Sequence, residues 1–454
     1  MNRLTLFQWL AFLALNAVVI YVFCLALFAP PSDAKKALLP GTTTHGHYQI
    51  EMDCSACHTP GLGIDQESCL QCHEQELKEA RDTHPASKFN DPTNATRLEI
   101  LDAQKCTTCH REHVEDQTSA MGLTLPEDYC YHCHQETLQT RPSHANLSFD
   151  SCSTSGCHNY HDNRALYENF LVKHYEQPDH LQTQLTPRRS SKRRTSQQLA
   201  EADFPRDMEV DPVYLEKIVE DWSNTAHASI QCTACHSPPT SSATENHWVT
   251  KLETGKCSEC HLPEHEGFLA GRHGMRFSRN LEAMKVAEAR IEMHSDASHR
   301  SLNCVSCHED HRFDTKFAAV EACLQCHADN HSLSYKRSPH YALFNSETEG
   351  DGETGSGVSC ATCHLPRIVG HGEEVTVQHN QNNNLRPNEK MARDVCMNCH
   401  GLQYSLNSLI DKDQIANCFT TPPRLHTNSL DMAKAWFDAK EKAKQERLRK
   451  RAEN

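Results

Sequence analysis

The distribution of cysteine constrains this chain more than any other feature of its sequence. Of 24 cysteines, 22 fall into eleven pairs, and every pair is followed immediately by a histidine. Ten pairs have the spacing C-x-x-C-H, and one has four residues between its cysteines, as C-S-T-S-G-C-H. Because the same pattern occurs eleven times, we look for one chemical function that every motif shares.

We number these motifs one to eleven in chain order, so that the widened motif is motif five. They are Cys54, Cys57 and His58; Cys69, Cys72 and His73; Cys106, Cys109 and His110; Cys130, Cys133 and His134; Cys152, Cys157 and His158; Cys232, Cys235 and His236; Cys257, Cys260 and His261; Cys304, Cys307 and His308; Cys323, Cys326 and His327; Cys360, Cys363 and His364; and Cys396, Cys399 and His400. Two cysteines, Cys24 and Cys418, lie outside the motifs.

C-x-x-C-H is the attachment signature of c-type haem, in which two thiols hold the macrocycle and the next histidine ligates the iron. A zinc site pairs two C-x-x-C units but needs no histidine after each of them. A disulfide would not need the histidine either. We therefore predict about eleven covalently attached haem c groups, with the 22 cysteines as attachment sites and the eleven motif histidines as iron ligands.

The composition agrees with an interior filled by such groups. Hydrophobic residues make up 37% of the chain and aromatic residues 7%, which is too little for a large side-chain core. Strand patterns are nearly absent, so we expect a mostly irregular and α-helical multihaem fold with almost no β-sheet. The net charge of −15 disfavours nucleic acid as a partner, because phosphate would be repelled.

The motifs recur in the same order in two halves of the chain. Residues 44–158 and 226–364 each contain five motifs, with further histidines at similar places between them. These matched histidines are our candidates for the second iron ligand of each haem. They are His47, His84, His113 and His144 in the first half, and His227, His273, His311 and His340 in the second.

The repeat and the changes in composition predict five segments. They are a transmembrane anchor over 1–30, a first five-haem module over 44–180, a basic flexible linker over 181–207, a second module with six haems over 220–405, and a charged C-terminal helix over 428–454. Spaced apolar residues among helix formers also predict a helix over 280–295.

The N-terminal segment is long enough to cross a bilayer. Residues 9–29 are apolar except for Asn16, and this stretch exceeds the ~7–15 apolar residues of a cleavable signal. An uncleaved anchor is the favoured interpretation, and a cleaved signal is the alternative. Haem attachment of this type takes place outside the cytoplasm, so we expect a bacterial inner-membrane protein with its haem domain in the periplasm.

The motif order over residues 220–405 resembles the group of hydroxylamine oxidoreductase, octahaem tetrathionate reductase and tetrahaem cytochrome c-554. The phrase HASIQCTACH at 227–236 and CMNCHG at 396–401 carry this resemblance. The C-x-x-C-H-x-x-H repeats resemble class III cytochromes c, which also tolerate the wider spacing of motif five. These resemblances imply closely stacked haems that support electron transfer along the chain.

Two functions remain open at this point. The first is an electron carrier in a respiratory chain, with other redox proteins or a quinone-linked membrane complex as partners. Histidines outside the motifs number 21, enough for a second ligand at every iron. The alternative is an oxidoreductase for a small nitrogen or sulfur compound at one open haem, for which His400 is the candidate because it falls outside the repeat, with Cys418 as a possible reactive group nearby.

Overall fold

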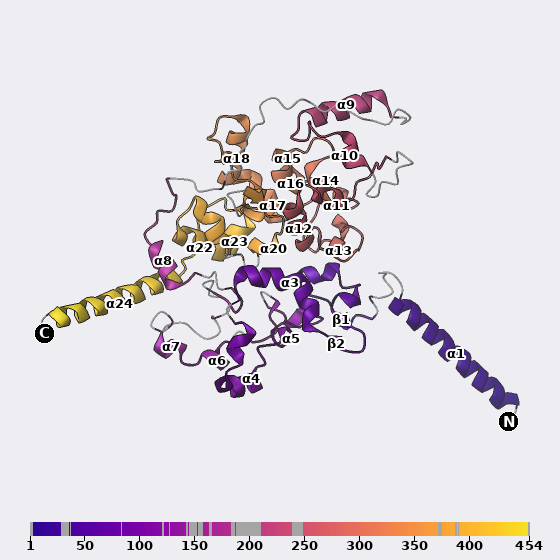
Figure 1. Ribbon diagram of the computed structural model, residues 1–454, viewed down its shortest axis with the longest axis horizontal. Helices are drawn as coiled ribbons and strands as arrows, with labels where there is room; N and C mark the ends of the chain where they lie inside the picture. The colour runs from indigo at the N-terminus through magenta and orange to yellow at the C-terminus, as the bar shows by residue number, and fades with distance from the viewer. Residues whose placement is uncertain are drawn as a thin grey trace. The chain divides into compact units, whose positions relative to one another are not determined.

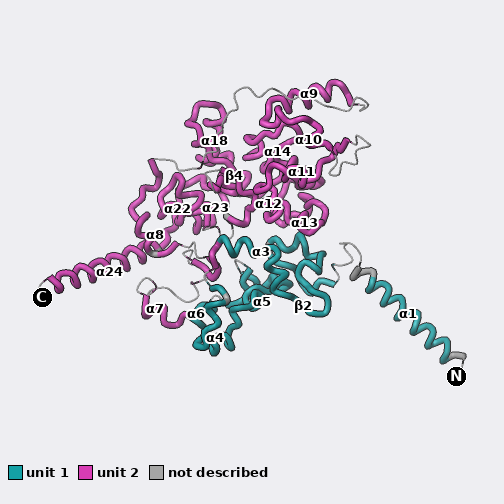
Figure 2. The backbone as a smooth tube through the Cα atoms, in the orientation of Figure 1, with its two compact units in different colours: residues 1–79, 84–133 teal, residues 80–83, 134–454 magenta. Residues whose placement is uncertain are grey.

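The computed structural model describes most of the chain and divides it into two compact units. The described residues are 3–28, 36, 38–82, 84–119, 122–126, 128–141, 144, 152, 158–162, 166–182, 187, 210–237, 248–370, 375–385, 388 and 390–452. Unit 1 comprises residues 1–79 and 84–133, and unit 2 comprises residues 80–83 and 134–454 (Figure 2). The predicted basic linker lies largely outside the described residues, as does Cys157 of motif five.

Short helical turns and irregular segments make up most of unit 1 (Figure 1). Its elements are α1 (Arg3–Phe28), η1 (His45–Gln49), η2 (Cys54–Ala56), β1 (His58–Thr59), β2 (Gly63–Ile64), α3 (Gln66–Ala80), η3 (Ala86–Phe89), η4 (Pro92–Asn94), α4 (Ala95–Ile100), α5 (Cys106–Cys109), η5 (Glu115–Gln117) and α6 (Tyr131–His134). β1 and β2 pair antiparallel, with His58 opposite Ile64.

Unit 2 is built in the same way from many short helices. Its elements are α7 (Thr137–Thr140), α8 (Glu168–Lys173), α9 (Pro212–Ser223), α10 (Cys232–His236), α11 (Thr254–Ser258), α12 (Leu262–Ala270), α13 (Met275–Ser278), η9 (Val286–Glu288), η10 (Ser295–Ala297), α14 (Cys304–His308), α15 (Thr315–Ala319), α16 (Glu321–Leu324), α17 (Asn330–Ser334), η11 (Tyr335–Arg337), α18 (Pro339–Glu349), α19 (Cys360–His364), β3 (Arg367–Val369), β4 (Val375–Val377), α20 (Asn382–Leu385), α21 (Lys390–Asp394), η12 (Cys396–Asn398), α22 (Leu402–Ile410), α23 (Lys412–Ala416) and α24 (Ser429–Ala452). β3 and β4 form a second antiparallel pair.

The predicted fold class is confirmed, because helices and irregular segments dominate and the described strands form only two small sheets. Unit 1 ends within motif four, so the two units do not follow the predicted five-haem and six-haem modules. The units reflect contacts in space, whereas the modules reflect repetition in sequence. The module boundaries therefore stay a prediction.

The apolar helix at the N-terminus has the length and composition of a membrane span. α1 contains such a stretch over Thr5–Cys24, and large side chains such as Trp9 and Phe12 are exposed along it. Asn16 donates to the Phe12 carbonyl (2.7 Å), so its side-chain amide has a partner inside the helix. At ~1.5 Å per residue the helix is about 39 Å long, against ~30 Å of hydrocarbon in a bilayer. It fits either a membrane anchor or a signal sequence.

An apolar side-chain core lies around motif eleven in unit 2. It joins α8, α21, α22, η12 and α24, and it contains the fully buried Leu402 and Leu430. The first turns of α24 pack against α8, and Figure 1 shows α24 starting beside α8 and running away from it toward the C-terminus. The C-terminal helix predicted over 428–454 is therefore observed, and its N-terminal part belongs to the body of unit 2.

Replacing Leu430 by alanine is expected to destabilise unit 2 by about 2–5 kcal/mol, because a fully buried leucine leaves a cavity in this core. Leu448→Ala on the same helix is the matched control, since Leu448 is 57% exposed. Its effect is expected to stay within about 0.5 kcal/mol. Denaturant unfolding followed by circular dichroism checks both values, and equal effects would contradict this packing.

The helix predicted over 280–295 is wrong. The chain leaves the helical conformation after α13 and runs extended beside residues 300–302, with Val286 N–H donating to the Arg300 carbonyl (3.0 Å) and Leu302 N–H to the Met284 carbonyl (2.9 Å). Met284 and Val286 are both buried by this arrangement. Tertiary contacts next to motif eight therefore outweigh the local helix propensity of the segment.

Candidate haem-binding sites

Most motifs fold into a single helical turn that places the two cysteines and the histidine on one side. In motif ten, α19 spans Cys360–His364, and corresponding turns form in motifs three, six and eight. In motif eleven, the backbone N–H of His400 donates to the Cys396 carbonyl (2.8 Å). Residues at positions i, i+3 and i+4 of a helix share one face, so C-x-x-C-H directs both thiols and the imidazole toward the same space.

The described motif cysteines all retain some solvent exposure, in contrast to the buried Cys418. The most exposed are Cys54, Cys57, Cys72, Cys235 and Cys260, whereas the others are partly buried, with Cys133 and Cys326 among them. A thiol must be accessible to form a bond with a haem vinyl group, so this exposure is compatible with attachment. The attachment role of each of these cysteines stays a prediction.

Capping side chains stabilise some of these turns. Ser359 Oγ accepts from the Thr362 N–H (3.1 Å), and Thr362 Oγ1 accepts from the Ser359 N–H (3.0 Å). Asn303 and Ser306 form the same reciprocal pair at motif eight. These residues precede or lie between the cysteines, so the local sequence itself favours the turn that presents the motif.

The variant Ser359→Ala is expected to lower the free energy of unfolding by about 1 kcal/mol, because one N-cap hydrogen bond is lost. The haem content is expected to stay unchanged, since no attachment residue is altered. Ser298→Ala serves as the control at an exposed position that is not an N-cap. Urea denaturation compares the two variants, and indistinguishable midpoints would contradict the role of the cap.

Nine motif histidines lie opposite a second imidazole that comes from elsewhere in the chain. The ring-centroid distances are 6.4 Å for His58–His113, 6.0 Å for His73–His47, 6.2 Å for His158–His144, 5.9 Å for His236–His311, 6.0 Å for His261–His227, 6.3 Å for His308–His379, 6.3 Å for His327–His273, 5.9 Å for His364–His331 and 6.2 Å for His400–His340. Two imidazoles that bind one metal from opposite sides through ~2 Å bonds have centroids ~6 Å apart. The spacing fits one iron between each pair.

Seven of the eight predicted second ligands take part in these pairs. They are His47, His113, His144, His227, His273, His311 and His340. The eighth, His84, stacks against Phe89 at 6.4 Å, and its role as a ligand stays a prediction, as do the second ligands of His110 and His134. The sequence interpretation missed two paired histidines, His331 and His379.

The first two motifs of each half have equivalent histidine partners in the two halves of the repeat. His47 and His227 each face the second motif, whereas His113 and His311 each face the first. His113 and His311 also share a left-handed backbone, with φ of 66° and 61°. Such a conformation is unfavourable for a residue other than glycine and is typical of functional sites.

The two histidines that follow the fourth motif of each half differ in their partners. His144 faces His158 of motif five, but His340 faces His400 of motif eleven, which has no counterpart in the first half. His331 in α17 faces motif ten instead. The matched positions of His144 and His340 therefore do not correspond to matched partners.

Hydrogen bonds at Nδ1 orient many of the paired rings. Nδ1 lies 3.0 Å from the Gly41 carbonyl in His113, 2.9 Å from the Val377 carbonyl in His379, 2.5 Å from the Ile415 carbonyl in His331, 2.7 Å from the Val249 carbonyl in His236 and 3.0 Å from the Asp179 carbonyl in His400. A carbonyl accepts only, so Nδ1 carries the proton in each ring. The lone pair is then on Nε2, which is the arrangement found in metal-ligating histidines.

His47 has a carboxylate partner instead of a carbonyl. Its Nδ1 lies 2.6 Å from Glu112 Oε1, and the Thr44 N–H and hydroxyl both donate to the same carboxylate. Burial alone would raise the pKa of Glu112, but these hydrogen bonds lower it to about 2. Glu112 therefore stays ionised and fixes the orientation of the His47 ring.

Burial keeps the deepest rings in the neutral form that a metal requires. It lowers the pKa of His273, His340 and His364 to about 4 in each case, with the facing motif histidine or a neighbouring imidazole as the next cause. An imidazole must be deprotonated at one nitrogen to bind iron. The imidazoles of these three residues are therefore neutral at physiological pH even before a metal binds.

Thiols of successive motifs lie beside one another within each unit. The side chains of Cys69 and Cys106, of Cys257 and Cys304, and of Cys323 and Cys360 lie beside each other. Cys235 lies near Cys257, Cys307 lies near Cys323, and Cys363 lies near Cys396 and Cys399. Motifs six to eleven in unit 2 therefore follow one another in space in their order along the chain, without a break.

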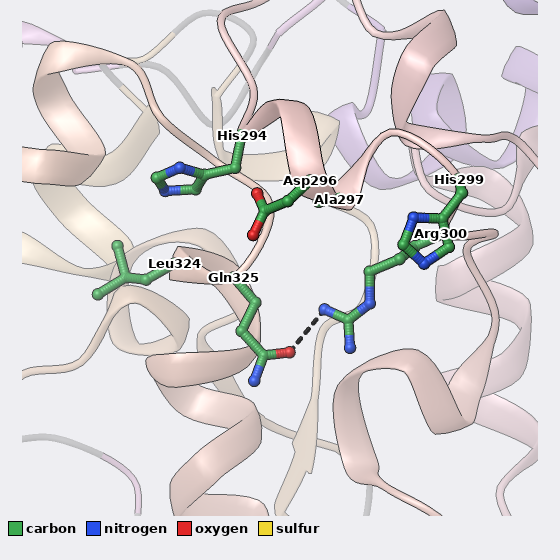
Figure 3. Close-up of a pocket in the computed structure, with 7 residues that line it drawn as sticks. All are labelled: His294, Asp296, Ala297, His299, Arg300, Leu324 and Gln325. Atoms are coloured by element: carbon green, nitrogen blue, oxygen red, sulfur yellow. Dashed lines mark hydrogen bonds between the residues drawn. The ribbon is translucent and has the colours of Figure 1, made fainter.

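A pocket of about 370 Å³ lies on the outer side of motif nine (Figure 3). Its wall contains Leu324 and Gln325, the two residues between the cysteines of this motif, together with His294, Asp296, Ala297, His299 and Arg300. Arg300 donates to Gln325 Oε1 (2.6 Å) across it. The lining is mainly polar, unlike the apolar pockets that bind drug-sized ligands. We therefore interpret the pocket as a solvent-exposed edge of the motif nine site.

Comparisons with known proteins indicate the class of protein to which these motifs belong. Residues 46–135 match the family model described as cytochrome c3. The nine-heme cytochrome c of Desulfovibrio desulfuricans is 23% identical over 291 residues, which cover 62% of this chain and 82% of that protein. No solved structure matches the chain.

The cytochrome c3 match covers motifs one to four, where C-x-x-C-H-x-x-H occurs, and it agrees with the resemblance to class III cytochromes c. The resemblance of residues 220–405 to the hydroxylamine oxidoreductase group stays a prediction. The attachment motifs, the facing imidazoles and these similarities lead to one conclusion. The chain is a multihaem c-type cytochrome.

Proposed function

We propose that this cytochrome is a membrane-anchored electron carrier with eleven haem c groups. The observation that carries the proposal is that every motif from six to eleven has an opposite imidazole. An iron with two histidine ligands has no open position for a substrate, so it transfers electrons and does not break or form substrate bonds. His340 occupies the place where a substrate would have to bind at motif eleven.

The proposed path runs through unit 2 in chain order, from motif six to motif eleven. Neighbouring thiols mark each step of this path, as described for Cys257 with Cys304 and for Cys323 with Cys360. Haem c, when bound, supplies one-electron chemistry at its iron. The residues of the chain hold the ring pairs, and at His47, His113, His236, His331, His379 and His400 they direct Nδ1–H toward a carbonyl or carboxylate.

We further propose that α1 anchors the protein in the bacterial inner membrane with the haem domain in the periplasm, where electrons are exchanged with a quinone-linked complex or other redox proteins. The length of α1 and its exposed apolar side chains support an anchor. A variant in which a cleavable export signal replaces residues 1–35 is expected to appear, loaded with haem, in the soluble periplasmic fraction. Full-length protein in that same fraction would contradict the anchor.

The electron-carrier proposal is tested by supplying the purified protein with electrons and possible substrates. The dithionite-reduced protein is expected to pass electrons to a ferric acceptor through all its haems. It is expected to show no steady-state consumption of nitrite, hydroxylamine or tetrathionate beyond that of free haem. Sustained turnover of any of these compounds would favour the enzyme alternative.

A further inference from the structure

The exposed half of α24 carries a dense positive charge in an otherwise acidic protein. Between residues 440 and 451 there are seven lysines and arginines and two glutamates, a local charge of +5, against −15 for the whole chain. The side chains from 442 to 451 are exposed. Figure 1 shows this part of α24 extending beyond its contact with α8.

Helical spacing gathers four of these charges on one face. Lys440, Lys444, Arg447 and Arg451 are separated by four, three and four residues, so they form a continuous row along the helix, which we call the basic row. Glu446 lies on another face, whereas Glu441 lies three residues before Lys444 and forms an ion pair with it (3.4 Å), so this one charge of the row is partly neutralised. Leu448 and Ala443 are the apolar residues of this half, so the helix has no apolar face to bury.

The helix is attached beside the last haem-binding motif. Leu430 and Ala433, in its first turns, share an apolar core with Val395 and with Met397, which lies inside motif eleven. Near its middle, Lys440 Nζ lies over the Trp436 ring at 4.7 Å, at the start of the basic row. The row begins ten residues, about 15 Å, along the helix from Leu430, so a partner held at that end of the row would lie on the side of unit 2 that carries motif eleven.

We propose that the basic row of α24 is a docking surface for an acidic redox protein that exchanges electrons with the haem of motif eleven. The inference rests on the proposed electron-carrier function and adds the partner and the point of contact. One electron leaves the reduced partner, and one ferric haem gains it. Opposite charges raise the rate of encounter, and they favour α24 because the rest of the chain is acidic overall, apart from the basic linker over 181–207.

The row fits an acidic protein better than a lipid surface. A helix that lies on a membrane usually buries an apolar face among the acyl chains, and α24 offers none beyond residue 440. Anionic headgroups could attract the charges alone, at about 1 kcal/mol per lysine or arginine. Lipid binding is therefore a distinct outcome of the experiment.

The experiment uses the full-length haem-loaded protein and a purified flavodoxin of net negative charge as the reduced partner. Stopped-flow absorbance gives the second-order rate of haem reduction between about 20 mM and about 500 mM salt, a range over which screening removes long-range attraction. The wild-type rate is expected to fall steeply with salt. The variant K440E/K444E/R447E/R451E is expected to react about tenfold or more slowly at low salt and to lose this dependence.

The control variant K217E/K251E/K316E/K412E has the same change in net charge at exposed positions of unit 2 away from α24. It is expected to retain most of the wild-type rate. Equal slowing in both variants would overturn the proposal, because net charge and not the row would then govern encounter. The proposal would also be overturned if the variant with the altered row lost binding to vesicles of anionic phospholipid but was reduced by flavodoxin at the wild-type rate. Reduction by dithionite shows whether the haems themselves remain competent in each variant.

Discussion

Replacing Cys360 and Cys363 together by alanine is expected to reduce the haem content from eleven to ten and to interrupt the path through unit 2. These two thiols are the predicted attachment sites of motif ten. Motif ten lies between motifs nine and eleven, because Cys360 lies beside Cys323 and Cys363 lies near Cys399. Without covalent attachment the macrocycle is not retained. Intact-protein mass spectrometry counts the haems directly.

Cys418 provides a matched control for this double variant. It is a buried cysteine that packs in the same cluster as Cys360, but it belongs to no motif. Cys418→Ser is therefore expected to retain eleven haems. Loss of a haem in this variant would show that attachment does not follow the motifs. Replacing Cys54 and Cys57 together by alanine, at motif one in unit 1, is expected to leave ten haems as well, but to leave reduction through unit 2 unchanged.

The second large effect is expected from His340→Ala. His340 is the imidazole opposite His400, at 6.2 Å between ring centroids, and its removal leaves one iron with a vacant position. Electron paramagnetic resonance of the ferric protein is expected to show one high-spin haem in eleven. Added cyanide is expected to bind that haem and convert its signal to low spin, whereas the unchanged protein is expected not to respond.

His180 is the natural control for His340, because it is another imidazole near the same motif. Its ring lies 4.9 Å from that of His400. The backbone carbonyl of its neighbour Asp179 accepts the hydrogen bond from His400 Nδ1, which leaves Nε2 as the nitrogen that would bind iron. His180→Ala is therefore expected to keep every haem low-spin. A high-spin signal in His180→Ala and none in His340→Ala would reverse the assignment.

The sequence predicts the attachment sites because covalent chemistry fixes their spacing. Two thiols and an imidazole must reach the same macrocycle, and C-x-x-C-H places all three on one helical turn. The repeat also predicts His113 and His311 as equivalent residues, and the structure gives them the same backbone conformation and the same partner motif. The local sequence pattern was therefore sufficient to predict both the attachment motifs and the equivalence of His113 and His311.

Pairs formed across long stretches of chain could not be predicted in this way. His379 comes from the segment after β4 and faces His308, 71 residues earlier, and no spacing rule connects them. His331 follows the histidine of motif nine by four residues, as a ligand of that motif would, yet it faces motif ten. Cys418, considered as a reactive group near His400, lies instead 3.8 Å from Nε2 of His331. Tertiary folding decides each of these contacts.

The central claim is that the chain carries eleven haems and that each iron has two histidine ligands. The most direct test is the electron paramagnetic resonance and optical spectrum of the ferric full-length protein, together with a haem-to-protein ratio by mass spectrometry. The account predicts eleven haems, all low-spin and unresponsive to cyanide or nitrite. A lower haem count, or a stoichiometric high-spin signal that shifts when either ligand is added, would contradict it.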